Sequence, residues 1–180
     1  WSSQASASGI PSSILDDFAW QAEGTRIPDI YDALPFTSGL AYETYGIDPI
    51  DPADTVGTSY VPALPAGALV DQTGTLESHG ATTSTSFFYA NNYMDRFYIG
   101  ASLGIFGFRY KEVSSHSETV PDESIDLKDL TFREQLNVTG NGIDLKIGFI
   151  ARLTDRFRTG LAIHSPMWTQ LNDVYTTDMR

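Results

Sequence analysis

The feature that most constrains the fold of this chain is a run of alternating apolar and polar residues. Between residues 143 and 153 the odd-numbered positions are apolar, and the even-numbered positions are mostly charged or small. A period of two recurs at residues 97–105 and, more loosely, at 157–167 and 82–93. Successive side chains of a strand point to opposite faces, so each run predicts a β-strand with one apolar face. We therefore predict an all-β, antiparallel sheet of four strands within residues 69–180.

Short turns join these strands in pairs. The tripeptide Asp-Arg-Phe occurs at residues 95–97 and again at 155–157, each time with room for only a tight turn between two strands. Residues 69–180 are therefore predicted to form two β-hairpins. Residues 114–129, between the hairpins, are acidic and polar and are predicted to form a long loop. Short turns at one end and long loops at the other are typical of outer-membrane barrels.

The first part of the chain, residues 1–68, is predicted to be a long loop with short helices. It contains seven of the nine prolines. Ser12 and Ser13 are suitable N-caps for a helix from Ile14 to Glu23, which Gly24 would end. A second short helix is predicted from Thr37 to Tyr45. In the complete barrel this segment would be an extracellular loop.

Alternation alone does not tell which solvent the apolar face meets. In a soluble sandwich it packs on a second sheet, and in a membrane barrel it meets lipid while the polar face lines the lumen. Three features favour the barrel. The strands of 11 and 9 residues match the roughly 9 to 11 residues that a membrane strand needs; the polar face is rich in charge; and aromatic residues cluster near the strand ends.

The strand count predicts that the barrel is incomplete. Closed barrels of this kind begin at 8 strands, and an open sheet in lipid leaves unpaired backbone groups, each of which costs several kcal/mol. We expect the missing strands to come from more of the same polypeptide, or from copies of it. The chain is interpreted as an internal fragment.

The phase of the alternation changes at two glycine-containing places. Residues 130–138 are apolar on even numbers, whereas residues 143–153 are apolar on odd numbers. We predict a β-bulge at Gly140–Gly142 that inserts one residue and reverses the faces. A similar shift at Gly107 would turn Arg109 and Lys111 inward.

Composition excludes several classes of function. The chain has 11 basic and 23 acidic residues, a net charge of −12, which disfavours binding to nucleic acids. It has no cysteine, which removes disulfides and thiolate metal sites. No uncharged apolar stretch is long enough for a membrane helix. No nucleophile elbow, phosphate loop or pair of catalytic carboxylates is found, so no enzymatic activity and no cofactor are predicted.

Several segments resemble one family of membrane proteins. Residues 141–150 (NGIDLKIGFI), 154–160 (TDRFRTG) and 162–166 (AIHSP) are similar to the FadL/TodX family of outer-membrane transporters, as are residues 12–16 and 40–45. The resemblance implies a barrel of about fourteen strands in the outer membrane of a Gram-negative bacterium. It also implies an N-terminal plug, which has no counterpart here, and passive uptake of hydrophobic compounds such as long-chain fatty acids or aromatic hydrocarbons.

Two groups of residues are candidates for ligand binding. Apolar side chains of the loop helices would capture a hydrophobic solute: Ile14, Phe18, Trp20, Phe36, Leu40 and Tyr45. The alternative is that they pack on one another to order the loop. In the lumen, Lys146, Arg152 and Arg158 would hold the carboxylate of an amphipathic ligand. The alternative is that they pair with Asp144 and with neighbouring strands.

No metal or haem site is predicted. His164 has no second histidine at ligand spacing and is interpreted as a hydrogen-bonded strand residue. Asp48, Asp51 and Asp54 recur every third residue, but the spacing is not that of a calcium loop, and a solvated acidic loop is the better interpretation.

The leading functional prediction is therefore passive transport of hydrophobic small molecules across the outer membrane. A second hypothesis is a barrel of the same family that serves as a surface or secretion-system scaffold and binds protein partners through its loops. A third is a soluble β-sandwich adhesin, which would bury the apolar strand faces under a second sheet.

Overall fold

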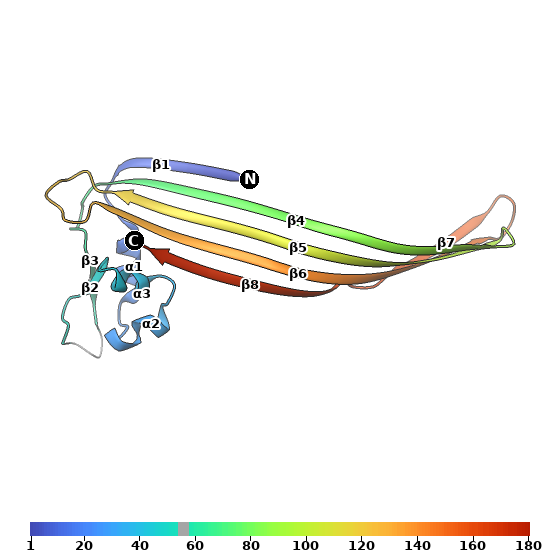
Figure 1. The fold of residues 1–180 in the computed structure, drawn as a ribbon, viewed down its shortest axis with the longest axis horizontal. Helices are drawn as coiled ribbons and strands as arrows, with labels where there is room; N and C mark the ends of the chain where they lie inside the picture. Colours follow the sequence, from blue (N-terminus) through green and yellow to red (C-terminus); the bar gives the residue numbers. More distant parts are fainter. Residues whose placement is uncertain (54–57) are drawn as a thin grey trace. The chain divides into compact units, whose positions relative to one another are not determined.

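The computed structural model describes residues 1–53 and 58–180. The chain is mostly antiparallel β-sheet, with 60 % of its residues in strands, a curled main sheet and few helices. The elements, in chain order, are β1 (Ser2–Ile10), α1 (Ile14–Ala22), η1 (Ile27–Asp29), α2 (Ile30–Ala33), α3 (Ser38–Glu43), β2 (Ile47–Pro49), β3 (Tyr60–Pro62), β4 (Val70–Tyr93), β5 (Phe97–Thr119), β6 (Asp129–Arg152), β7 (Arg158–His164) and β8 (Trp168–Met179). Figure 1 shows their course.

The main sheet has the strand order β1, β4, β5, β6, β7, and β8 also pairs with β6. Strands β7 and β8 therefore pair with successive parts of the same strand, β6. They are separated at Ser165–Met167, where Pro166 lacks the N–H that a ladder requires. The antiparallel sheet predicted for residues 69–180 is confirmed. It has five strands in this range instead of the predicted four, and β4, β5 and β6 are 24, 23 and 24 residues long, at least twice the predicted length.

Four stretches predicted as loop are strand in the structure: β1, β2, β3 and residues 114–119 at the end of β5. β1 was expected to belong to the helical loop, but Ser2–Glu77 and neighbouring pairs join it to β4. The predicted acidic loop at 114–129 is shorter, because β5 continues to Thr119 and β6 begins at Asp129. The polar residues of this part of β5 belong to the first compact unit described below, where they form hydrogen bonds and pack against other side chains. The buried side chain of Glu118 is an example.

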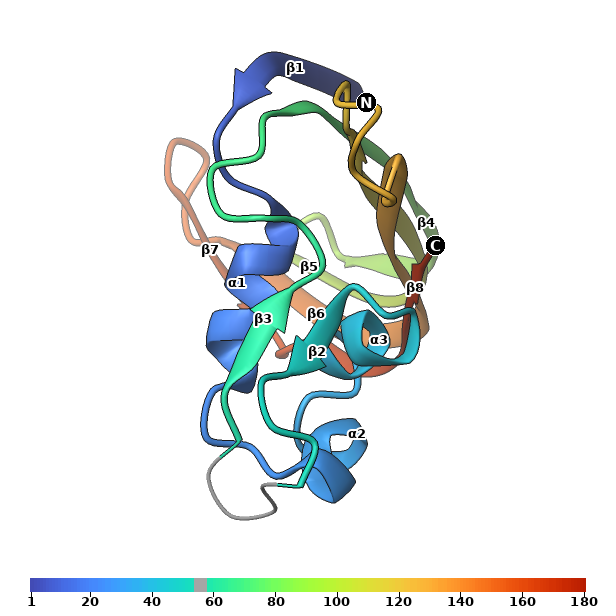
Figure 2. The same cartoon turned by 90° about the vertical axis from the view of Figure 1, so that its left-hand side faces the viewer.

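The chain divides into two compact units, which we describe separately. The first consists of residues 1–78, 112–136 and 175–180, and the second of residues 79–111 and 137–174. The first unit holds all the helices and the small sheet of β2 and β3. Figure 2 faces this unit and shows α1, α3, β2 and β3 gathered together.

Two helices of the first unit form where the sequence predicts them, whereas η1 and α2 were not predicted. Ser13 caps α1 in a capping box with Asp16, and Gly24 follows with φ of +78°. Helix α3 lies within the range predicted for the second helix. The buried face of α1 consists of Leu15, Phe18, Ala19 and Ala22, which share one side of the helix by spacing.

The core of the first unit lies between these helices and the adjoining strand ends. Phe18 of α1 meets Phe132 of β6 edge to face, with ring centroids 5.1 Å apart. Leu130 of β6 and Val120, just after β5, belong to the same buried cluster. The even-numbered apolar residues at the start of β6 therefore face protein.

This packing explains, without a bulge, why the apolar residues of β6 change from even-numbered to odd-numbered positions. From Leu130 to Asp144, across the glycines, the buried residues of the continuous strand β6 are even-numbered: Leu130, Phe132, Gly142 and Asp144. An inserted residue would have moved burial to odd numbers. The bulge predicted at Gly140–Gly142 is therefore wrong: the faces stay the same, and their surroundings change.

The shift predicted at Gly107 is wrong for the same reason. Phe106 and Phe108 stack on one face with ring centroids 6.4 Å apart, so the alternation passes through Gly107 unchanged. Arg109 and Lys111 consequently lie on the face of Leu103 and Ile105, and not on the inner face as predicted.

Gly140 has a different role. A Cβ atom built on it would lie 2.5 Å from the carbonyl oxygen of Gln170 and 2.5 Å from Cδ2 of Leu171. Glycine is required here because β8 approaches the strand closely.

Candidate functional site

The candidate site lies in the second unit, on the hairpin of β6 and β7. The register pairs Lys146 with His164 and Arg152 with Arg158, and the pairs between them follow in steps of one residue. Directly paired residues of an antiparallel ladder lie on the same face. The three predicted cations, Lys146, Arg152 and Arg158, therefore share one face, and His164 joins them there.

Two of these cations have acidic partners. Lys146 Nζ lies 3.2 Å from Asp144 Oδ2, and Arg152 Nη2 lies 2.9 Å from Asp155 Oδ1. The alternative that these cations pair with acidic side chains, and do not hold a ligand, therefore applies to Lys146 and Arg152. Arg158 is exposed, and none of the ion pairs found in residues 1–53 and 58–180 includes it.

Asp144 is the most enclosed member of this face. Its side chain passes over Gly104 of β5, where a Cβ would lie only 2.3 Å from Oδ1. That oxygen is buried and has no hydrogen-bond partner within the described residues. Its other oxygen binds Lys146, so the pair fixes the lysine close to the strand.

The opposite face of the same strands is apolar and uncovered. Ile143, Leu145, Ile147 and Phe149 are 38–48 % exposed, although each sits inside a paired strand. On β5, Ile99, Leu103 and Ile105 are exposed in the same way. None of these residues belongs to the buried core, and no second sheet covers them in the part of the chain that the structure describes.

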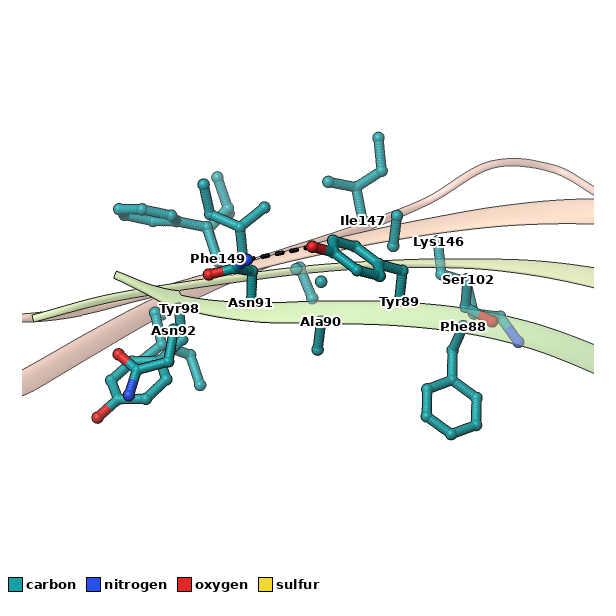
Figure 3. A pocket seen from close by; sticks show the side chains of 18 of the residues that line it. Phe88, Tyr89, Ala90, Asn91, Asn92, Tyr98, Ser102, Lys146, Ile147 and Phe149 are labelled. Atoms are coloured by element: carbon teal, nitrogen blue, oxygen red, sulfur yellow. Dashed lines mark hydrogen bonds between the residues drawn. The ribbon is translucent and has the colours of Figure 1, made fainter. Parts of the chain in front are cut away.

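A cavity of about 770 Å³ lies on the second unit. It is lined by residues 88–92 of β4, 98–102 of β5, 146–150 of β6, and residues 160–162 and 164 of β7. Figure 3 shows Phe88 and Tyr98 pointing to one side, and Tyr89, Ile147 and Phe149 to the other. The lining is mainly apolar, with amide, hydroxyl and ammonium groups from Asn91, Ser102 and Lys146.

Sequence reasoning did not identify Phe88 and Tyr98 as site residues. Both occupy even positions, where the neighbouring residues are small or polar, so the dominant alternation concealed them. Two aromatic rings on a charged face are a signal that a search for exceptions to the period would have found. They add apolar contact surface to the lining that also contains Lys146.

The six loop residues predicted to bind a hydrophobic solute do not form one group. Phe18 is 3 % exposed and belongs to the core, and Ile14 and Leu40 pack against that core. Trp20 and Tyr45 are 77 % and 78 % exposed. Phe36 is half exposed and meets Tyr175 of β8, with ring centroids 5.2 Å apart.

A buried carboxylate anchors α1 to β5 and was not predicted. Glu118 accepts hydrogen bonds from Ser13 Oγ, from the backbone N–H of Ile14 at 2.8 Å and from Gln72 Nε2 at 3.1 Å. His116 Nε2 lies 2.8 Å from the same carboxylate. Burial acts to raise the pKa of Glu118, but the hydrogen bonds from His116, Ser13 and Ile14 outweigh it and hold the pKa below its ordinary value. This group is structural, because it joins a helix N-terminus to a strand.

Metal binding finds no support in residues 1–53 and 58–180, where no three His, Asp or Glu side chains come together. His164 is exposed on β7. Asp48 is exposed, Asp51 accepts a hydrogen bond from the N–H of Ala53 at 2.9 Å, and Asp54 lies outside the described residues. No helix in the described ranges is both long and apolar enough to span a membrane.

Comparison with known protein families and with curated proteins found no match. The resemblance to the FadL/TodX family therefore stays a prediction.

Proposed function

We propose that this chain is part of the wall of an outer-membrane β-barrel that admits hydrophobic small molecules passively. The observation that carries the proposal is the pair of opposite faces on the second unit. One face is apolar, and its side chains Ile143, Leu145, Ile147 and Phe149 are exposed. The other face carries Lys146, Arg152 and Arg158. Strands with an apolar outer face and a polar inner face are the signature of such barrels.

The soluble sandwich explains the same faces less well. It requires a second sheet against the apolar side chains, and the described residues supply none. Leaving so many apolar side chains in water is costly, at about 25 cal/mol per Å² of apolar surface. Lipid contact removes that cost without a second sheet.

The polar face supports conduction of an amphipathic or apolar solute. The lining of the cavity of about 770 Å³ includes the aromatic side chains of Phe88 and Tyr98 and the ammonium group of Lys146. Arg158 is the cation of this face without an acidic partner among the described ion pairs, so it is the group we assign to a ligand carboxylate. Long-chain fatty acids satisfy both requirements, and aromatic hydrocarbons satisfy the apolar one.

Uptake by cells that express the intact gene tests the proposal. We expect radiolabelled oleate and toluene to enter faster than in cells without the gene. Arg158→Gln is expected to slow oleate uptake several-fold and to leave toluene uptake unchanged, because only oleate has a carboxylate. Equal uptake with and without the gene, for both solutes, would contradict transport.

One observation favours a scaffold as the second candidate. Trp20 and Tyr45 are large side chains left exposed on the ordered helical unit, which is typical of protein-binding surfaces. If Trp20→Ala and Tyr45→Ala abolish binding of a surface or secretion partner while uptake is absent from the start, the scaffold is favoured over the transporter.

A further inference from the structure

The apolar face of the second unit ends in a group of cations. Along β5 the residues of this face run from Phe97 to Ile105, then Gly107, and then Arg109 and Lys111. On β6 the corresponding change is from Ile143 to Asn141 and Thr139. Because the alternation has no phase shift, Arg109 and Lys111 stand in line with the apolar band.

A shallow groove marks this place. Its volume is about 370 Å³, and it is lined by residues 79–81 of β4, 109–111 of β5 and 137–139 of β6. A Cβ built on Gly80 would touch Cδ2 of Tyr110 at 3.3 Å, so these two residues share the other face. Alternation then places His79 beside Arg109 and Lys111 on the groove side.

The groove is cationic, although the whole chain carries a net charge of −12. The second unit contains four carboxylates, Asp95, Asp144, Asp155 and Asp173. Asp95 and Asp155 lie in the turns, and Asp144 is on the lumenal face with Lys146.

Asp173 also lies away from the groove. A Cβ on Gly142 would meet the side chain of Thr169, and one on Gly140 that of Leu171, so Asp173 follows them onto the even-numbered face of β6. None of the ion pairs found in the described residues includes Arg109 or Lys111. No carboxylate is among the residues that line the groove, which therefore presents positive charge.

We propose that Arg109 and Lys111 bind the phosphate group of an anionic membrane lipid. The inference deepens the proposed function, on which it rests. Arg109 is four residues beyond Ile105, about 13 Å along the strand, or about 9 Å along the membrane normal for a strand tilted near 45°. That distance reaches the headgroup layer, and a long cationic side chain covers the remaining difference. Guanidinium and ammonium groups are the natural donors to phosphate.

Trp168 of β8 is a reporter on the apolar band. Thr169 shares the face of Gly142, so Trp168 shares the face of Ile143 at the end of the apolar band. Trp168 is 57 % exposed, and indole rings favour this interfacial depth. Lipids with brominated acyl chains quench a tryptophan that they contact, so Trp168 reports which lipid occupies the band beside Arg109.

The test uses the full chain, reconstituted in bilayers, with Trp1 and Trp20 replaced by Phe. Brominated phosphatidylglycerol is titrated against brominated phosphatidylcholine, and their relative binding constants are obtained from quenching. We expect a preference for phosphatidylglycerol of about fivefold per cation, the equivalent of ~1 kcal/mol for each. Arg109→Gln with Lys111→Gln is expected to abolish the preference. Arg26→Gln with Lys128→Gln removes the same charge from exposed loops and is expected to preserve it.

The outcomes separate the two proposals. Quenching by both lipids without preference, or an equal loss in the loop control, overturns the lipid site and leaves the barrel intact. Absence of quenching by either lipid overturns the barrel proposal itself. If free inorganic phosphate at constant ionic strength abolishes the preference, the groove binds free phosphate, and the lipid assignment is wrong.

Discussion

At the scale of single residues, Glu118 shows how a polar residue is retained in a strand that the sequence predicts as loop. Its carboxylate is buried and receives bonds from Ser13, Ile14 and Gln72, with His116 alongside. The carboxylate therefore replaces water at the start of α1, where backbone N–H groups lack partners.

We predict that Glu118→Gln destabilises the attachment of α1 by about 1.5–3 kcal/mol, the usual value of hydrogen bonds to a charged group. The pKa of Glu118 is lowered from its ordinary value of 4.5, so its stabilisation is present above that pH and is lost as the pH falls through the lower folded value. Amide hydrogen exchange of residues 14–22 measures both effects. A loss of protection as the pH falls below 4.5 that is unchanged in the variant would contradict the assignment.

Met94 gives a second prediction at this scale. Met94 and Asp95 form the turn between β4 and β5 with φ of +53° and +55°, and the N–H of Arg96 donates to the carbonyl of Tyr93 at 3.1 Å. Such positive angles favour glycine or asparagine. Met94→Gly is therefore expected to stabilise the hairpin by about 1 kcal/mol, measured as a shift of the denaturant midpoint. Asp155→Gly serves as the control, because no positive φ is found at the second turn, and it should not stabilise.

These two turns also show a limit of sequence comparison. The repeat Asp-Arg-Phe predicts the place of both turns, and both are present. It does not predict their geometry, because Asp95 is left-handed and Asp155 is not. In the first turn Asn92 Nδ2 donates to Asp95 Oδ1, and the backbone N–H of Asp95 donates to Asn92 Oδ1. In the second turn Arg152 Nη2 donates to Asp155 Oδ1, but the backbone N–H groups of Arg156 and Phe157 donate to Thr154 Oγ1.

At the scale of the strand, the two faces give the sharpest test of what surrounds the sheet. Ile147→Lys places a charge on the apolar face, and Ser102→Lys places the same group on the opposite face. In bilayers we expect the first change to cost about 2–4 kcal/mol and the second less than 1 kcal/mol. Folding yield into vesicles measures the difference. Equal costs would mean that lipid does not contact Ile147.

At the scale of the strand, the period of two in the sequence led both to correct predictions and to wrong ones. The period of two identified the long strands and placed Lys146, Arg152 and Arg158 on one face, as the register confirms. The same pattern suggested bulges, because an apolar face was assumed to have one kind of neighbour throughout. Leu130 and Phe132 pack on α1, whereas Ile143 does not, and that difference depends on residues more than a hundred positions away.

At the scale of the whole molecule, the composition of the helical unit limits what could be predicted. Its apolar residues were assigned to a ligand groove from their number alone. Only the fold shows that Phe18 is enclosed by Phe132 while Trp20 remains exposed, because the two residues lie on different sides of one helix. Number and spacing predict a face, but not what covers it.

A final prediction belongs to this scale. If strands of the intact protein close into a barrel, the native protein should run faster on a gel before boiling than after it, because a closed barrel resists detergent unfolding. The isolated residues 1–180 should lack this shift, because their sheet has open edges. A shift in both samples, or in neither, would contradict closure by additional strands.

The unbroken parity of β5 and β6 restricts how such a protein changes during evolution. Deleting one residue near Asn141 would exchange the two faces along the rest of the strand, moving Asp144 to the apolar face and Ile143 to the polar face. Deleting two neighbouring residues would keep every remaining side chain on its own face. The strands of relatives should therefore differ in length by an even number of residues, because only an even change keeps each side chain on its own face.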